Sequence, residues 1–501
     1  MSDCTKISLA NTLLSMAAIR GDAPAVVGND IELTFRQLAE RCAQTGHELI
    51  AAGIQPGQHV GIAVRDSVEY LVSIFGIWMA DAVAVPIDFR SSIEERQRIA
   101  SAFDLAAILQ DRPATYEGCE AMLIDAAYKD RRATRPVLPP PMTGPDAPAY
   151  ISLTSGTTGT PLGFVIGHGA MLAKTEWDPY RYLPGCGGPR ELDLVTLNAL
   201  PLSFSAARTH VFARLLSGGK TIFFPMMHTL PELAEAMQRH RVEFSFTVPT
   251  VVRGLMDLAP DNGQPFFPDL KLFYIGGANL NRDEKLAAQK ILTPHAMTNY
   301  ASTASGTLAS LYGDDMRARP DSEGRVLSSS RIEIVDGQDT VLRHGEQGIL
   351  RVRAPGMATH IYGGQGREDG DKIRAGWIYP GDIASIDTEG FLSIHGRQSD
   401  LIIRGGSNVY PSEVEAAIAA LPGVREVAVI GFETAREGEE IAAFVVVKDG
   451  MTQADIDAHC RRALTSDKRP REIVILDALP RNTNGKVLKR DLSEMVPAGK
   501  I

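Results

Sequence analysis

Residues 154–161 read TSGTTGTP, a segment of hydroxyl-bearing residues and glycines between two apolar stretches, 149–153 and 164–166. Its hydroxyls, and the backbone N–H groups that glycine leaves accessible, can surround a polyphosphate. The segment lacks the pattern G-x-x-x-x-G-K-[ST], so it is not a Walker A loop. A polar turn between two strands is the alternative interpretation of these residues taken alone. We predict a phosphate-binding loop made of Thr154, Ser155, Gly156, Thr157, Thr158 and Gly159.

Apolar runs on both sides of this segment predict a mostly parallel sheet covered by helices. A strand at 59–64, a helix at 68–80 and a strand at 83–87 form the βαβ pattern of a doubly wound fold. From about residue 324, short apolar runs between glycine-rich turns predict a small antiparallel sheet. A second α/β unit is predicted from strands at 196–199, 220–224, 243–248 and 272–275.

The pattern changes after Gly396 and Arg397. Apolar residues there predict helices at 411–421 and 454–464 and strands at 427–430, 441–447 and 472–476, enough for a compact α+β domain. We therefore predict an α/β protein with a large N-terminal domain, 1–396, made of two doubly wound α/β subdomains and a small β-sheet region. A small α+β C-terminal domain, 397–501, follows it.

Composition excludes several classes of protein. The 501 residues carry a net charge of -10, which argues against a nucleic-acid partner. Five scattered cysteines predict neither a disulfide framework nor a zinc site, and a cytoplasmic location is expected. The apolar stretch 70–87 contains Asp81 and divides into a buried helix and strand, so no membrane span is predicted. The proline-rich segment 131–148 is expected to be a surface connection.

Seven segments in chain order resemble motifs of the acyl-adenylate-forming superfamily of acyl-CoA synthetases, luciferases and nonribosomal-peptide adenylation domains. Each segment alone has an ordinary structural explanation, and their order over essentially the whole chain carries the resemblance. They are the threonine-rich segment, then 276–278 (GGA), 298–303 (TNYAST), 379–382 (YPGD), 396–400 (GRQSD), 405–415 (GGSNVYPSEVE) and 480–486 (PRNTNGK).

The resemblance implies a role for individual residues. Tyr300 is expected to stack on adenine, Thr303 to face the phosphates and a metal ion, and Asp382 to hold the ribose hydroxyls. Asp400 is expected to be the hinge about which a mobile C-terminal domain rotates to present the 405–408 loop for thiol attack. The other nucleotide-binding residues implied are Gly277, Ala278, Asn299, Arg397 and Lys486.

Lys486 is the expected catalytic residue. Attack of a carboxylate on the α-phosphorus of ATP brings two anions together, so catalysis must neutralise charge. A lysine between the acyl carboxylate and the α-phosphate stabilises the growing negative charge and orients the attack.

Two positions depart from the superfamily pattern. Leu162 stands where relatives commonly have a lysine, which removes a phosphate-facing ammonium worth about 1.5 to 3 kcal/mol. Ala304 stands where they have a metal-binding glutamate, and Ala301 replaces a glycine. Magnesium relies on one or two carboxylates plus substrate phosphates and water, so we expect a weaker magnesium site at Thr303.

The acid pocket is expected at Phe204, Ser205 and Gly276. Relatives that activate amino acids place an aspartate after the residue that Phe204 resembles, so Ser205 disfavours an α-amino acid. Arg208 and His210 either pair with a second substrate carboxylate or have a structural role.

These expectations combine into one function. The chain is predicted to be an acid–thiol ligase that uses ATP, magnesium and coenzyme A to convert a small carboxylic acid into its thioester through an acyl-adenylate. Transfer to a stand-alone carrier protein or to an amine is one alternative. A homologue that binds nucleotide with little turnover, because of Leu162 and Ala304, is the other.

Overall fold

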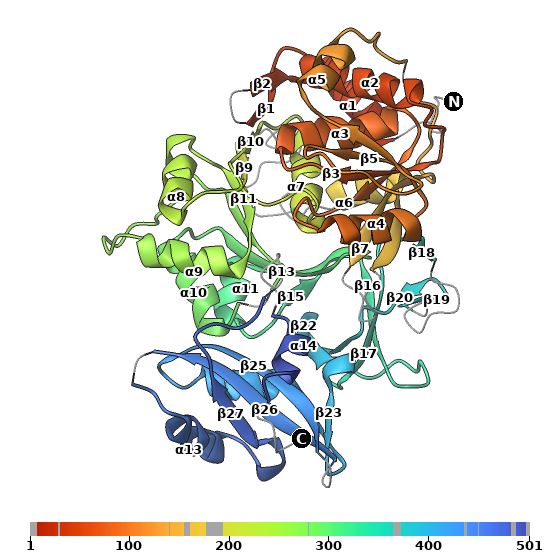
Figure 1. Cartoon of the computed structure of the whole chain (residues 1–501). Helices are drawn as coiled ribbons and strands as arrows, with labels where there is room; N and C mark the ends of the chain where they lie inside the picture. The colour runs from red at the N-terminus through yellow and green to blue at the C-terminus, as the bar shows by residue number, and fades with distance from the viewer. Residues whose placement is uncertain are drawn as a thin grey trace. The chain divides into compact units, whose positions relative to one another are not determined.

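The computed structural model describes residues 8–28, 31–139, 141–154, 161–176, 194–278, 280–363, 372–434, 438–448, 450–481 and 487–496. The chain divides into two compact units (Figure 1). The first consists of Met1–Arg331 and Val352–Ile378, and the second of Ile332–Arg351 and Tyr379–Ile501. The sequence analysis predicted a boundary between Gly396 and Arg397, where a mobile C-terminal domain was expected to begin. That boundary stays a prediction.

The predicted α/β class is confirmed, and the first unit holds most of the helices. They are α1 (Leu9–Arg20), α2 (Phe35–Ala51), α3 (Ser67–Met79), α4 (Ile93–Ala102), α5 (Ala126–Ala133), α6 (His168–Glu176), α7 (Ser205–Leu216), α8 (Leu230–Arg239), α9 (Pro249–Leu258), α10 (Arg282–Ile291) and α11 (Gly313–Ala318).

One sheet of the first unit has the strand order β18-β8-β7-β4-β3-β5-β6. Its centre is parallel, as the βαβ pattern predicted, while β7, β8 and β18 pair antiparallel. The strands are β3 (His59–Ala63), β4 (Val83–Pro86), β5 (Leu105–Gln110), β6 (Glu120–Leu123), β7 (Pro148–Thr154), β8 (Leu162–Gly167) and β18 (His360–Tyr362).

The other sheet of this unit has the order β15-β14-β13-β12-β11-β9-β10-β1-β2. From β1 to β13 along this order the neighbours are parallel, and β2, β14 and β15 add antiparallel edges. The strands are β1 (Pro24–Gly28), β2 (Ile31–Thr34), β9 (Thr196–Asn198), β10 (Thr221–Phe223), β11 (Phe244–Thr247), β12 (Leu272–Ile275), β13 (Ala296–Ser302), β14 (Gly306–Tyr312) and β15 (Gly324–Val326).

Both faces of the central strand β12 are buried, which is why its sequence, LFYI, is continuously apolar. Phe273 and Ile275 of β12 pack with residues of α8, α9 and α10. Leu272 and Tyr274, which alternate with them, pack on the opposite face with Ala207 of α7. Figure 1 shows α8, α9 and α10 on one side of β11 and α7 on the other.

Helices α3, α6 and α7 join the two sheets of the first unit. Phe212 of α7 contacts Trp78 of α3 edge to face at 5.5 Å, and the Trp78 indole N–H donates to the Ala149 carbonyl of β7 at 2.7 Å. Arg208 of α7 lies over the Tyr150 ring of β7 at 4.7 Å. α7 therefore packs against both sheets.

The second unit consists of antiparallel strands, which the sequence analysis assigned to the N-terminal domain, followed by the predicted small α+β fold. Strands β25 (Val424–Thr434) and β26 (Gly438–Val447) pair antiparallel, and β27 (Glu472–Ile475) adds parallel to β26. Helices α12 (Pro411–Ala419) and α13 (Gln453–Ala463) pack on these strands. Two strands, β16 (Arg331–Val335) and β17 (Gly348–Arg353), cross the boundary between the units.

The remaining strands and helices complete the chain. They are β19 (Ile373–Arg374) and β20 (Trp377–Ile378) of the first unit, and β21 (Asp382–Ile386), β22 (Phe391–Arg397), η5 (Gln398–Asp400), β23 (Ile402–Arg404), β24 (Ser407–Val409), α12 (Pro411–Ala419), β25 (Val424–Thr434), β26 (Gly438–Val447), α13 (Gln453–Ala463), η6 (Ser466–Lys468), β27 (Glu472–Ile475) and α14 (Lys489–Ser493) of the second.

Two sequence expectations have clear outcomes here. The apolar stretch 70–87 forms most of α3 and all of β4, and none of the described helices is long and apolar enough to cross a bilayer. The expected surface connection at 131–148 was wrong at its start. Residues 131–133 end α5, and Arg132 is buried in an ion pair with Glu69 at 2.6 Å.

The buried histidine at the start of α6 makes the fold sensitive to acid. His168 is 1% exposed, and its Nδ1 accepts a hydrogen bond from the Leu9 N–H of α1 at 3.3 Å. Burial lowers the pKa of His168 from 6.5 to about 4. Between these values the unfolded chain binds a proton that the folded chain does not, so stability falls as the pH falls.

We expect His168 to contribute about 3 kcal/mol to the loss of unfolding free energy between pH 7 and pH 4. Denaturant unfolding of the wild type and of His168→Asn at both pH values measures this contribution. Asparagine can still accept the Leu9 N–H but does not titrate. An equal pH dependence in the two proteins would contradict the prediction.

Candidate functional site

The carboxyl ends of parallel strands in the first unit bring the predicted adenine and acid-pocket residues together. Thr247 of β11 is in register with Ile275 of β12, and Ile275 is in register with Thr298 of β13. Gly276 directly follows β12, and Asn299 is the next residue of β13. In open α/β sheets this edge is where ligands bind.

Gly276 is required by the side chain beside it. A Cβ atom at this position would lie 2.6 Å from Oδ1 of Asn299 and 3.2 Å from the Phe246 ring. Asn299 Oδ1 is buried and has no hydrogen-bond partner in the described part of the chain. This amide oxygen is therefore an acceptor suited to a ligand donor such as an exocyclic amine.

Phe204 reaches the same edge from the segment after β9. A Cβ atom at Gly277 would lie 3.3 Å from the Phe204 ring, and Gly277 has a φ of +89°, which glycine adopts without strain. Phe204 and Phe246 have ring centroids 6.1 Å apart. The structure thus places Phe204, Gly276 and Gly277 together, and Ser205 begins α7 next to them.

Arg208 and His210 have structural partners in α7. Nη1 of Arg208 donates to the carbonyl oxygens of Leu202 and Ser203 at 2.8 and 3.1 Å, which holds the turn before Phe204. The His210 ring stacks on Phe246 at 4.8 Å and contacts Tyr274 at 4.5 Å. These contacts fit the structural alternative for both residues.

The end of β13 carries the predicted phosphate and metal position. Tyr300 is partly buried in β13, with a register shift between Tyr300 and Ala301. Ala304 is buried, and its carbonyl accepts the Ala358 N–H at 2.6 Å. Nζ of Lys174 donates to the Thr303 carbonyl at 3.5 Å. The sequence interpretation missed Lys174, since a lone lysine in a helix carries no local signal.

The described residues do not supply a carboxylate site for magnesium. No group of three His, Cys, Asp or Glu side chains that could hold a metal is found among them. At the expected position they offer the Thr303 hydroxyl and the Ala304 methyl group. Such a donor set does not fit a Mg²⁺ ion held by protein side chains.

The second unit brings Asp382 and Arg397 together. They are opposite each other in β21 and β22, and Nε of Arg397 lies 2.8 Å from Oδ1 of the buried Asp382. Nη1 of Arg397 also donates to the Pro380 carbonyl at 3.0 Å. The arginine therefore holds both the carboxylate and the turn that precedes it.

The expected hinge is also tied within the second unit. Oδ2 of Asp400 lies 3.4 Å from Nζ of Lys489 in α14, and the same ammonium lies 3.2 Å from Glu415. Arg481 pairs with Val487 in an isolated bridge and with Glu426 at 2.9 Å, so both ends of the predicted lysine loop are held. Lys486 itself, Ser155 to Gly159 and the side chain of Thr154 lie outside the described residues.

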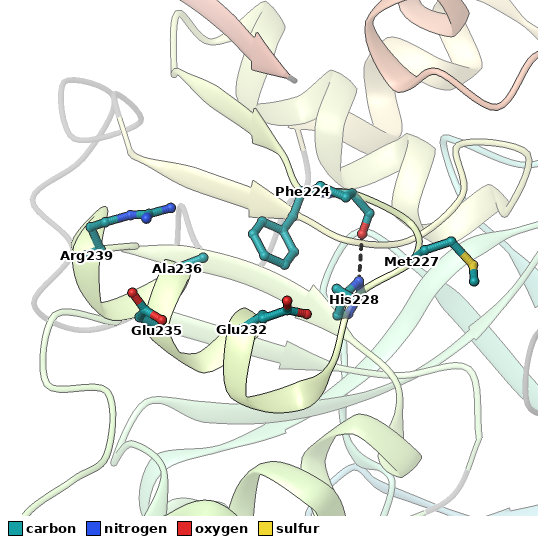
Figure 2. A pocket seen from close by; sticks show the side chains of 8 residues that line it. Phe224, Met227, His228, Glu232, Glu235, Ala236 and Arg239 are labelled. Atoms are coloured by element: carbon teal, nitrogen blue, oxygen red, sulfur yellow. Dashed lines mark hydrogen bonds between the residues drawn. The ribbon is translucent and has the colours of Figure 1, made fainter. Parts of the chain in front are cut away.

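A pocket of about 200 Å³ is lined by other residues of the first unit, and Figure 2 shows their side chains. Glu232, Glu235 and Arg239 line it from α8, and Phe224 and His228 line it from the segment after β10. His228 Nδ1 lies 2.7 Å from the Pro225 carbonyl oxygen. None of the residues predicted from the sequence lines this pocket, so we assign it no function.

Comparison with known proteins identifies the class. The AMP-binding enzyme family model matches residues 15–362, and the AMP-binding enzyme C-terminal domain model matches residues 413–486. The chain belongs to this family and thus to the acyl-adenylate-forming superfamily, as its motifs predicted.

The similar proteins include coenzyme A ligases. The chain is 30% identical to the long-chain-fatty-acid CoA ligase FadD13 of Mycobacterium tuberculosis over 491 residues, 94% of each chain. It is 26% identical to the 2-succinylbenzoate CoA ligase of Bacillus cereus, over 98% of this chain and 99% of the relative. The ATP-bound structure of MatB from Rhodopseudomonas palustris is similar with a TM-score of 0.86 and 25% identity, over 98% of this chain and 99% of that chain.

Gly276→Ala tests the strand-edge site. The added methyl group collides with the Asn299 amide, and displacement of a positioning group by about 1 Å costs up to a hundredfold in rate. We expect kcat/KM for ATP to fall roughly ten- to a hundredfold in an ATP–pyrophosphate exchange assay. Gly337→Ala, where an added methyl group meets no atom within 4 Å, is the matched control. Unchanged kinetics in Gly276→Ala would exclude this edge as the nucleotide site.

Proposed function

We propose that this protein is an ATP-dependent acid–thiol ligase of the cytoplasm that converts a carboxylic acid into its coenzyme A thioester through an acyl-adenylate. The observation that carries the proposal is the cluster of Phe204, Gly276, Gly277 and Asn299 at one strand edge, in a chain that belongs to the AMP-binding enzyme family. The coenzyme A ligases among its relatives support the choice of acceptor.

In the first half-reaction, a carboxylate oxygen of the acid attacks the α-phosphorus of ATP. A new O–P bond forms, the bond from the α-phosphorus to the bridging oxygen breaks, and pyrophosphate leaves. Lys486 would stabilise the negative charge that accumulates between the two reactants. Asn299 and Tyr300 would hold the adenine, and Asp382, oriented by Arg397, would hold the ribose.

In the second half-reaction, the thiol sulfur of coenzyme A attacks the acyl carbon. The C–O bond to AMP breaks, AMP leaves, and the thiol proton passes to solvent. Rotation about Asp400 would remove Lys486 between the half-reactions and bring the 405–408 loop to the thiol. The ion pair from Lys489 to Asp400 lies at this hinge, where a change of partners would accompany the rotation.

The acid is proposed to be apolar near its carboxylate. Phe204, Phe246 and Val248 are the apolar side chains beside the two glycines of the pocket, next to the Asn299 amide oxygen. Ser205 cannot neutralise a substrate ammonium, so an α-amino acid is disfavoured.

Lys486→Ala tests the proposed mechanism. We expect AMP release that depends on both a carboxylic acid and coenzyme A to fall at least a hundredfold, because the charge between carboxylate and α-phosphate is no longer stabilised. Lys448→Ala, at an exposed lysine of the same unit, should keep full activity. AMP release that proceeds with an amine or a carrier protein but never with coenzyme A would overturn the choice of acceptor.

Leu162→Lys with Ala304→Glu tests whether the two departures abolish turnover. We expect the wild type to catalyse ATP–pyrophosphate exchange, and the double variant to reach half-maximal exchange at a several-fold lower Mg²⁺ concentration, because a carboxylate has been added. Exchange that appears only in the double variant would instead identify the wild type as a nucleotide-binding homologue without turnover.

A further inference from the structure

Two cationic side chains meet one face of the sheet that contains β7 and β8. Tyr150 is opposite Ile166 and Ser152 is opposite Phe164 in the antiparallel pair, so these four residues share a face. Because side chains alternate along a strand, Leu162 lies on this face as well. The register thus puts position 162 on the same side as Tyr150.

Helices α6 and α7 cover this face. The Tyr150 hydroxyl lies 3.3 Å from Sδ of Met171 in α6, and the guanidinium of Arg208 in α7 lies over the Tyr150 ring. Lys174 is three residues after Met171, so it is a neighbour of Met171 on the surface of the helix. The two helices therefore bring Lys174 and Arg208 to the side of the sheet where Leu162 has replaced a lysine.

The stem of Lys174 fills a space that two glycines leave open. A Cβ atom at Gly356 would lie 2.2 Å from Cγ of Lys174, and one at Gly306 would lie 3.3 Å from its Cε. The side chain ends at the Thr303 carbonyl, next to Ala304. Close packing of this kind directs the ammonium toward the end of β13 and limits its other positions.

The two cations lack a carboxylate partner. Neither Lys174 nor Arg208 is in an ion pair within the part of the chain that the structure describes. Arg208 is 1% exposed, and its Nε and Nη2 have no hydrogen-bond partner there. Burial, together with the charge of Arg208, lowers the pKa of the Lys174 ammonium to about 7. Buried charge without a counter-ion is costly, so this arrangement suits a bound anion.

We propose that Lys174 binds the β- and γ-phosphates of ATP, with Arg208 adding positive charge behind it, in place of the lysine that relatives have at position 162. This inference rests on the proposed function, because the anion is the polyphosphate of the ATP that the ligase uses. A phosphate fits better than an acid carboxylate, since Lys174 contacts Thr303 and not the pocket around Phe204 and Gly276.

Affinities for ATP and AMP, measured by titration calorimetry, test the assignment. Lys174→Met keeps the length and apolar stem of the side chain but removes its charge. We expect its Kd for ATP to rise roughly ten- to a hundredfold, the effect of one charged hydrogen bond, while its Kd for AMP changes little. Lys290→Met, at an exposed lysine of α10, should bind both nucleotides as the wild type does.

Two further variants separate charge from packing. Leu162→Lys in the Lys174→Met background should restore most of the ATP affinity, because it returns an ammonium to the same face. Gly356→Ala should weaken ATP binding with the lysine still present, because the methyl group displaces the Lys174 stem. Thermal melts of each variant confirm that it is folded.

The outcomes distinguish this inference from the proposed function. If the wild type binds ATP and catalyses exchange while Lys174→Met binds ATP equally well, the lysine is structural and only this inference fails. An equal loss of ATP and AMP affinity would also overturn it, since the cation would not face the terminal phosphates. If the wild type binds no ATP, both proposals fail.

Discussion

The parallel strands β11, β12 and β13 must be buried on both faces, and the candidate site depends on this constraint. A parallel sheet places the ends of its strands at one edge, and the helices that cover its two faces keep those ends in register. Phe273 and Ile275 meet one helical layer while Leu272 and Tyr274 meet the other. Gly276 and Asn299 lie at the carboxyl ends of these strands, where Gly276 is buried and the Asn299 amide oxygen has no hydrogen-bond partner among the described residues.

Charged side chains that are buried near a ligand are costly unless a charge of opposite sign lies beside them. The second unit pairs its charges within itself, where Arg397 holds the buried Asp382 and Lys489 joins Asp400 and Glu415. The first unit also pairs buried charges, as in Arg132 and Glu69, but Lys174 and Arg208 have no carboxylate partner among the described residues. The difference follows from what each unit is proposed to bind, a ribose on one side and a polyphosphate on the other.

The structure suggests how the chain compensates for Leu162, and it shows what surrounds Ala304. In the sequence these two positions lack charged groups, because a lysine and a glutamate are missing from the expected positions. In the structure a lysine from a neighbouring helix reaches the carbonyl next to Ala304, through a space that Gly306 and Gly356 keep open. A charge can therefore be supplied from a different part of the fold when its usual position is apolar.

The sequence alone predicted the fold class, the alternation of strands and helices along the chain and the segments proposed to form the site. Long apolar runs, glycine turns and ordered motifs are local features, and each is set by residues adjacent in the chain. Asp382 and Arg397 belonged to two of these motifs, and the expectation that both serve the nucleotide needed no structure. The lysine loop and the threonine-rich loop are proposed on the same basis.

Only the tertiary structure decided which charges are paired. Arg132 was expected at the surface because its segment is rich in proline. It is instead buried and paired with Glu69, which lies 63 residues earlier in the chain. Lys174 reads as an ordinary helical lysine until α6 packs beside Gly356 and Thr303. Burial and pairing depend on contacts between residues far apart in the chain, so no local pattern could have revealed them.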